Sequence, residues 1–233
     1  MISLLKSYIN SFSHLIYPHN CEGCGTDVLN DDSYLCAKCL HDLPITGFVA
    51  TANNPVEQSF YGKLQVEAAA SGFYFHKDGL VQHLVTQLKY KNHQEMGVFL
   101  GKLIGHQLSA TDRFDSVDVL VPLPLNHRKE DKRGYNQATL ICEGISQTWP
   151  KLICTDVVKR TIFTESQTSK TRIDRWQNME GVFELSNANS IAGKHVLLVD
   201  DVTTTGATLE ACGCEILKAP NTTLSIVTVA FAI

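Results

Sequence analysis

The chain has 233 residues, of which 44% are hydrophobic and 19% charged, an ordinary globular composition that provides one large core and a small appendage. The formal net charge of −4 at pH 7 argues against wholesale nucleic-acid binding but leaves room for a local basic patch. No window reaches 18 consecutive apolar residues, so we expect no membrane-spanning helix.

The first 20 residues carry apolar side chains at helical spacing, interrupted by Ser, Asn and Lys. They contain neither an uninterrupted apolar stretch nor a small-residue cleavage site of the kind found in signal peptides. We therefore expect a short amphipathic helix that packs on the body of the protein, and a cytoplasmic location.

Four of the eight cysteines form two C-x-x-C pairs separated by eleven residues: Cys21, Cys24, Cys36 and Cys39. Each pair places two thiolates on one turn, and two such turns complete a closed tetrahedral site of the type that binds structural Zn²⁺. Two disulfides or an iron–sulfur cluster are the alternatives, and a reducing compartment disfavours the disulfides. The other cysteines lie among apolar neighbours, and we expect buried free thiols there.

The charge around this cysteine cluster indicates what the module does. Residues 1–50 contain two lysines and five acidic residues, a balance of −3 before the thiolates are counted. A module that grips nucleic-acid phosphates is expected to be basic. The charge therefore favours a structural or protein-contact role over direct DNA binding.

The rest of the chain divides into periodic segments. Residues 46–60 are polar and turn-rich and are interpreted as a linker, so we expect a module over 1–45 and a larger domain over 61–233. A short β segment is predicted within 61–75, and apolar residues at helical spacing predict helices over 78–92 and 94–108.

Strands alternate with helices in the second half. Apolar, β-branched runs predict strands over 117–123, 153–158, 195–201 and 223–233, with helices near 136–148 and after Gly206. Continuous runs of this kind are typical of strands covered on both faces. The sequence therefore predicts an α/β fold with a parallel, doubly wound sheet flanked by helices.

The stretch VLLVDDVTTTGAT (196–208) joins a buried strand to a helix through two acids and a Thr/Gly loop. A helix N-terminus presents unpaired N–H groups that suit an anion, and Gly206 permits close backbone approach. Asp200 and Asp201 would repel a phosphate unless they face hydroxyl groups or a metal. The pattern therefore predicts a ribose 5-phosphate, with its hydroxyls on the two acids; the alternative is that Asp201 merely caps the turn. The predicted phosphate loop is Thr203, Thr204, Thr205, Gly206, Ala207 and Thr208.

This segment closely resembles the phosphoribosyl pyrophosphate (PRPP) motif of type I phosphoribosyltransferases. The resemblance implies a parallel-sheet core with a hood and a Mg²⁺–PRPP ligand, whose ribose hydroxyls the acids hold and whose 5-phosphate the loop holds. In purine-salvage relatives an aspartate, the usual candidate base, stands where this chain has Thr204. That departure argues against a purine acceptor handled in their way.

Several further motifs resemble the ComF (GntX-like) family of competence proteins over almost the full length. They are PHNCEGCG with the second C-x-x-C pair, LKYKNH (88–93), VPLPLNHRKEDKRGYNQA (121–138), and the Arg160–Asn178 pattern R-T-x5-Q-x4-R-x2-R-x2-N. Asn126-His127 departs from the His-Pro frequent in the family, which puts the geometry of that loop in doubt. The resemblance implies a role in natural competence, with incoming single-stranded DNA and a helicase partner.

Transfer of a phosphoribosyl group needs cations at the pyrophosphate that leaves. The resemblance assigns this role to the segment after VPLPL, with Arg128, Lys132 and Arg133. Arg172 belongs to a polar segment, 159–180, where type I enzymes carry a loop that closes over PRPP. The alternatives are a solvated charge run and an ordinary surface loop. Lys89 matches the family at a helix end and has either a functional or a structural role.

Two classes of function follow. The first is Mg²⁺-dependent phosphoribosyl transfer to an unknown acceptor. The second is a non-catalytic accessory protein that senses PRPP or binds single-stranded DNA alongside a competence helicase, with basic segments 127–133 and 159–175 on the DNA phosphates. The motif favours PRPP binding in both classes.

Overall fold

The computed structural model describes residues 20–27, 34–90, 93–161 and 181–233. The chain divides into two compact units, Met1–Leu43 and Pro44–Ile233, which we describe separately. The helix expected in the first 20 residues, and Arg172 with most of the polar segment around it, lie outside the described residues.

The described part of the first unit is built around the two C-x-x-C pairs. Residues Asn20 and Asp27 form an antiparallel bridge across the first pair. The second pair opens helix α2 (Ala37–His41), where the Cys36 side chain caps the helix by accepting a hydrogen bond from the Cys39 N–H. Leu35 and Leu43 are the other buried apolar residues of this unit.

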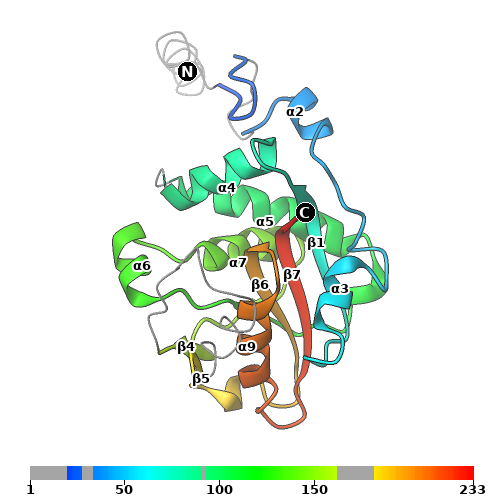
Figure 1. The fold of residues 1–233 in the computed structure, drawn as a ribbon, viewed down its shortest axis with the longest axis vertical. Coiled ribbons are helices and arrows are strands. Elements are labelled where there is room, and N and C mark those ends of the chain that lie inside the picture. Colours follow the sequence, from blue (N-terminus) through cyan, green and yellow to red (C-terminus); the bar gives the residue numbers. More distant parts are fainter. Residues whose placement is uncertain (1–19, 28–33, 91–92, 162–180) are drawn as a thin grey trace, which may run out of the picture. The chain divides into compact units, whose positions relative to one another are not determined.

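A five-stranded parallel sheet forms the centre of the second unit (Figure 1). Its order is β1 (Ala69–Phe75), β7 (Thr223–Ala232), β6 (His195–Thr203), β2 (Val119–Pro122) and β3 (Leu152–Ile153). The middle strands are buried almost along their whole length, as their unbroken apolar runs predict. A parallel sheet flanked by helices is thus confirmed.

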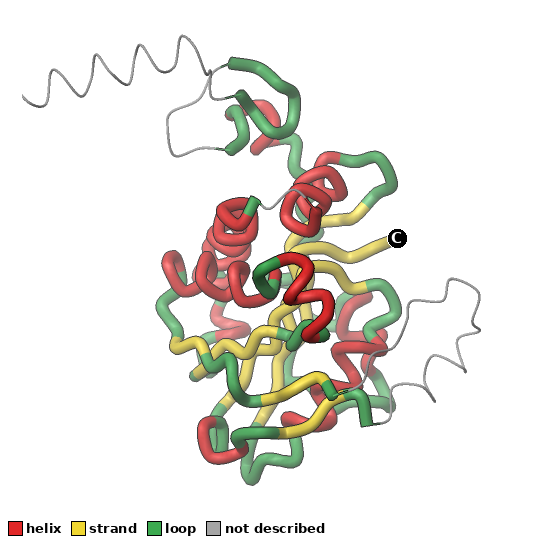
Figure 2. The backbone as a smooth tube through the Cα atoms, turned by 90° about the vertical axis from the view of Figure 1, so that its left-hand side faces the viewer, coloured by secondary structure: helices red, strands yellow, loops and turns green. Residues whose placement is uncertain are grey.

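Helices cover the sheet on both sides (Figure 2). The longer ones are α4 (Leu80–Tyr90), α5 (Gln94–Ser109), α7 (Gln137–Thr148) and α9 (Ala207–Ile216), and the shorter ones α3 (Pro55–Phe60), α6 (His127–Arg133), η1 (Asp112–Phe114) and η2 (Ala188–Ser190). A separate antiparallel hairpin joins β4 (Val158–Arg160) to β5 (Phe183–Leu185).

Glycines bring α5 and α7 into very close contact. A Cβ atom on Gly144 would lie 2.0 Å from the Val98 carbonyl oxygen, and one on Gly101 would lie 2.2 Å from the Ile141 carbonyl oxygen. Real Cβ atoms do not approach other atoms this closely, so both positions require glycine. Of this helix pair, α7 packs on β2 and β6.

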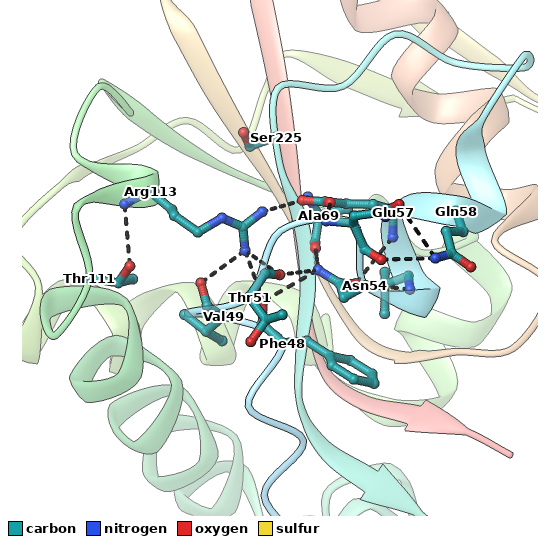
Figure 3. Close-up of polar contacts among 12 residues, drawn as sticks. Phe48, Val49, Thr51, Asn54, Glu57, Gln58, Ala69, Thr111, Arg113 and Ser225 are labelled. Atoms are coloured by element: carbon teal, nitrogen blue, oxygen red, sulfur yellow. Dashed lines mark hydrogen bonds and ion pairs between the residues drawn. The ribbon is translucent and has the colours of Figure 1, made fainter.

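The linker expected over residues 46–60 is wrong. This segment contains α3, and its Val56 and Phe60 side chains are fully buried. Polar side chains fix it to the sheet: Arg113 donates to the carbonyl oxygens of Phe48, Val49 and Thr51 and pairs with Glu57 (Figure 3). The polar residues that suggest a linker in the sequence are therefore members of a buried hydrogen-bond network.

The single strand expected over residues 153–158 is also wrong. Leu152 and Ile153 pair with β2, whereas Val158–Arg160 pair with β5 outside the main sheet. A bend at residues 155–157 separates the two, and Thr and Asp favour such bends because their side chains compete for backbone groups. The polar loop expected after VPLPL is mostly helix α6.

Candidate functional site

The four cysteines of the first unit come together as the spacing predicts. Their Sγ atoms all lie within 4.8 Å of one another, and those of Cys24 and Cys36 are 3.7 Å apart. The backbone N–H groups of Gly23 and Cys36 point at the Cys21 sulfur, at 3.4 and 3.2 Å. Four converging sulfurs with amide donors fit a closed tetrahedral Zn²⁺ site, and all four cysteines would hold the ion.

Local hydrogen bonds favour the thiolate form of one of these cysteines. The Thr26 hydroxyl lies 3.1 Å from the Cys24 sulfur. Hydrogen bonds from the Thr26 side chain and backbone lower the pKa of Cys24 to about 6. The thiolate is the form that binds metal, so these hydrogen bonds favour Cys24 as a ligand.

The second unit has its candidate site where strands β2 and β6 end side by side. Strand order reverses at this point, because the chain moves from β2 outward to β3 on one side and from β6 to β7 on the other. The Leu123 N–H donates to the Val199 carbonyl oxygen and holds the two strand ends together. Open α/β sheets bind ligands outside the carboxyl ends of strands at such a switch point.

The paired acids occupy this edge. Asp201 is 7% exposed, and both of its carboxylate oxygens contact the Lys89 ammonium of α4, at 2.9 and 3.0 Å. Burial and the neighbouring Asp201 charge raise the pKa of Asp200 to about 7, while Lys89 and Arg160 oppose this shift. Each acid thus has a cation near it, Lys89 for Asp201 and Arg160 for Asp200.

The Thr/Gly loop follows directly and opens α9. Gly206 adopts a left-handed conformation with φ of 76° and supplies no side-chain cap. The Ala207 N–H makes only a long hydrogen bond of 3.5 Å to the Thr205 hydroxyl, and the start of such a helix suits an anion. Thr204 and Thr205 are exposed, whereas Thr203 is buried. A Cβ on Gly206 would lie 3.0 Å from the Phe60 ring of α3, so this helix also shapes the loop.

The basic segment forms helix α6, which follows the carboxyl end of β2 in the chain. Asn126 caps that helix through the Arg128 N–H, and Gly134 ends it with φ of 79°. Arg128 and Lys132 are exposed. Arg133 donates to the Gln137 side-chain oxygen at 2.7 Å, so it contributes to the α6–α7 connection.

Two cations that the sequence pattern left undecided belong to the acid pair. Lys89 lies in LKYKNH, and the backbone directly before it is held because the Tyr135 hydroxyl donates to the Leu88 carbonyl oxygen. Arg160 lies on β4 with its guanidinium 5.4 Å from the Phe183 ring centroid, and it interacts with Asp200. Both residues lie in motifs that resemble the family, and this resemblance was the signal in the sequence that could have identified them. Their proximity to the acids depends on tertiary structure.

Comparison with known proteins agrees with this geometry. The phosphoribosyl transferase domain family matches residues 145–232, the region that contains β6, the Thr/Gly loop and α9. Competence protein F of Haemophilus influenzae is 32% identical over 54% of this chain and 57% of its own length. Competence protein ComFC of Bacillus subtilis is 34% identical over 46% of this chain and 42% of its own length.

These matches support assignment of the chain to the ComF-like protein family. DNA utilization protein YhgH of Escherichia coli K12 is 30% identical to this ComF-like chain over 54% of it and 56% of YhgH. The chain spans less than two thirds of the length of the curated relatives that it matches. The second unit has the fold of a type I phosphoribosyltransferase, and a small four-cysteine module precedes it in the chain.

Solved structures are more distant from this ComF-like chain. An adenine phosphoribosyltransferase is 16% identical, with a TM-score of 0.38 over 63% of this chain and 74% of that enzyme. A hypoxanthine phosphoribosyltransferase from Staphylococcus aureus is 17% identical, with a TM-score of 0.36 over 58% of this chain and 62% of the other. Among the described helices, none is both long enough and apolar enough to cross a membrane.

Proposed function

We propose that this ComF-like chain binds PRPP together with Mg²⁺ at the carboxyl edge of β6. The observation that supports this most is the order of features at the end of β6: two acids, a Thr/Gly loop with a left-handed Gly206, and the N-terminus of α9. In this proposal Asp200 and Asp201 accept hydrogen bonds from the ribose hydroxyls. The loop from Thr203 to Thr208 holds the 5-phosphate.

The same proposal assigns the leaving group to the basic residues. When the bond between C1 and pyrophosphate breaks, negative charge grows on the pyrophosphate, and cations nearby stabilise it. Arg128, Lys132 and Arg133 lie on α6, which follows the carboxyl end of β2 in the chain, and Arg172 is assigned to this group by its motif. The acceptor of the ribosyl group is unspecified, so pyrophosphate release with candidate bases, amines and nucleic acids would identify it.

Calorimetry with Mg²⁺–PRPP tests the binding site. We expect the double variant Asp200→Asn/Asp201→Asn to lose affinity by at least about a hundredfold, since each hydrogen bond to a charged group contributes about 1.5–3 kcal/mol. The matched control is Asp112→Asn/Asp115→Asn, which removes two charges at η1 and leaves the site intact. Equal affinity in the two double variants would refute the site.

A second function, binding of single-stranded DNA in the cytoplasm during DNA uptake, is supported by the names of the relatives. They are named for competence and for DNA utilization. Arg128 and Lys132 are exposed on α6 and would contact phosphates. We expect a gel shift that weakens with salt and weakens further in Arg128→Ala/Lys132→Ala. The absence of a shift at low salt would exclude this role.

A further inference from the structure

Lys89 is bound to the acid pair in the protein without ligand. Its ammonium contacts both oxygens of Asp201, at 2.9 and 3.0 Å. The Lys89 side chain is 24% exposed and that of Asp201 is 10% exposed. The pair is therefore partly shielded from water, where charge interactions are stronger than on an open surface.

The ammonium occupies both carboxylate oxygens of Asp201, to which a divalent cation would bind. Carboxylate oxygens are the ligands that Mg²⁺ prefers. Lys89 beside Asp201 and Arg160 beside Asp200 supply two positive charges against the two negative ones. A free divalent cation must therefore displace a cation that the protein itself supplies.

The end of α4 is held while the lysine stem remains adjustable. The Tyr135 hydroxyl anchors the carbonyl group of Leu88, the residue directly before Lys89. Tyr135 itself is 8% exposed, so the anchor is fixed. The four-carbon stem of lysine can still reorient its ammonium toward another anion, and phosphate oxygens are strong partners for it.

Building on the proposed function, we propose that Lys89 is a specificity-determining residue that makes the acid pair select metal-bound phosphosugar over free metal. Without ligand, its ammonium occupies Asp201 and excludes a divalent cation. When the phosphosugar arrives, Lys89 moves to a ligand phosphate, and Asp201 becomes free for the metal and the ribose hydroxyls.

Binding of Mn²⁺ alone to the full-length, zinc-loaded protein tests this role directly. Electron paramagnetic resonance measures the free Mn²⁺. We expect Lys89→Met to bind the ion about tenfold more tightly than the wild type, since a nearby opposite charge shifts the proton affinity of a carboxylate by one pKa unit or more and should oppose a metal cation to a similar degree. Adding Asp201→Asn should abolish the gain. Lys89→Arg should behave like the wild type because it keeps the charge.

Lys194 offers a matched control. It is another half-buried lysine whose ammonium is engaged, here by the Ser190 carbonyl oxygen at 2.7 Å, but it lies at the start of β6, away from the acids. Lys194→Met should leave Mn²⁺ affinity unchanged. If Lys89→Met binds Mn²⁺ no more tightly than Lys194→Met does, the proposal is overturned.

Affinity for Mg²⁺–PRPP separates this inference from the proposed function. We expect Lys89→Met to bind that complex about tenfold more weakly, because the ligand phosphate loses its ammonium partner. General damage to the fold would not produce a gain for metal and a loss for ligand in one variant. If the wild type does not bind PRPP but Lys89→Met binds Mn²⁺ more tightly, PRPP is wrong as the ligand and the exclusion of metal by Lys89 is supported. Intact PRPP binding with unchanged Mn²⁺ affinity would reject the role of Lys89 alone.

Discussion

Asp200 has a proposed role in ligand binding, but its burial lowers the stability of the folded protein at neutral pH. Burial and the adjacent carboxylate of Asp201 raise its pKa from 3.8 to about 7. The folded protein therefore holds a proton that the unfolded chain releases, and folding becomes less favourable as the pH rises from about 4 to 7. Above that range the full energetic cost of the charged, desolvated acid is present.

Asp200→Asn should remove this pH-dependent cost. We expect the variant to be more stable than the wild type at pH 8 by about 1–2 kcal/mol, and the difference to disappear nearly completely at pH 4, where the wild-type acid is also protonated. Urea denaturation at both pH values measures this. A difference that is the same at pH 4 and pH 8, or a variant less stable at pH 8, would contradict the interpretation.

Gly206 is required both by its backbone conformation and by its neighbour. In Gly206→Ala, the left-handed conformation costs about 1–2 kcal/mol for a residue with a Cβ, and that Cβ presses on the Phe60 ring. Gly193→Ala is the control, because Gly193 has φ of 71° and a Cβ added there would meet no atom within 4 Å. We expect thermal melts to show the larger loss in Gly206→Ala, and calorimetry to show weakened Mg²⁺–PRPP binding only there.

At the scale of elements, one buried ion pair fastens the segment before β1. Arg113 of the η1 turn reaches three backbone carbonyls of residues 48–51, and Glu57 of α3 accepts the Ala69 N–H of β1 at 3.2 Å. Asn54 adds a bond of 2.8 Å to the Ala69 carbonyl oxygen. α3 is thereby joined to the sheet edge, and its Phe60 ring lies against Gly206 of the Thr/Gly loop.

Removing Arg113 should be far more damaging than removing a surface cation. Arg113→Met leaves Glu57 buried without its partner, for which a loss of about 3–5 kcal/mol in the free energy of unfolding is expected. Lys218→Met breaks an ion pair whose lysine side chain is 63% exposed, and at most about 1 kcal/mol should be lost. Chemical denaturation compares the two, and similar losses would show that the Arg113 network contributes little.

A helix or strand could be predicted from the sequence where its pattern of apolar residues is long and continuous. Strands β2, β6 and β7 and helices α4, α5 and α7 carry long apolar patterns, which predict them close to their observed bounds. The α3 segment is missed because Asn54 and Glu57 look solvent-exposed in sequence, and Glu57 is buried only through a partner 56 residues away. The short β3 and β4 strands share one apolar run, which conceals the bend between them.

The candidate site is predictable in part for the same reason. The acids and the Thr/Gly loop are contiguous in sequence, so their pattern identifies them. Lys89 is 112 residues from Asp201, and no local pattern joins a helix end to a strand end. That contact depends on how α4 packs, which only the assembled fold determines.

At the scale of the whole molecule, the two units depend on different forces. The described part of the first unit has four cysteines and few other buried apolar groups, whereas the second has a large apolar core. Small units of this kind usually need a metal in order to fold. Metal removal should therefore affect the two units unequally.

We expect about one Zn²⁺ per chain by atomic absorption, and its loss in Cys36→Ser. Hydrogen exchange after chelation should show rapid exchange over residues 20–43 and unchanged protection in β6 and β7. Cys214→Ser is the control, since that cysteine is exposed on α9 and outside the cluster, and it should keep its metal. Loss of protection in β6 on chelation would show that the units are not independent.

The pairing of β1 with β7 has a consequence for biosynthesis. Ser71 and Thr228, whose hydroxyls are 2.6 Å apart in the finished sheet, are 157 residues apart in the chain. At translation rates of about 5–20 residues per second, β1 waits roughly ten to thirty seconds on the ribosome for its neighbour. A polysome therefore displays many copies of an unpaired apolar strand at once, and chaperone supply during translation should limit the yield of folded protein.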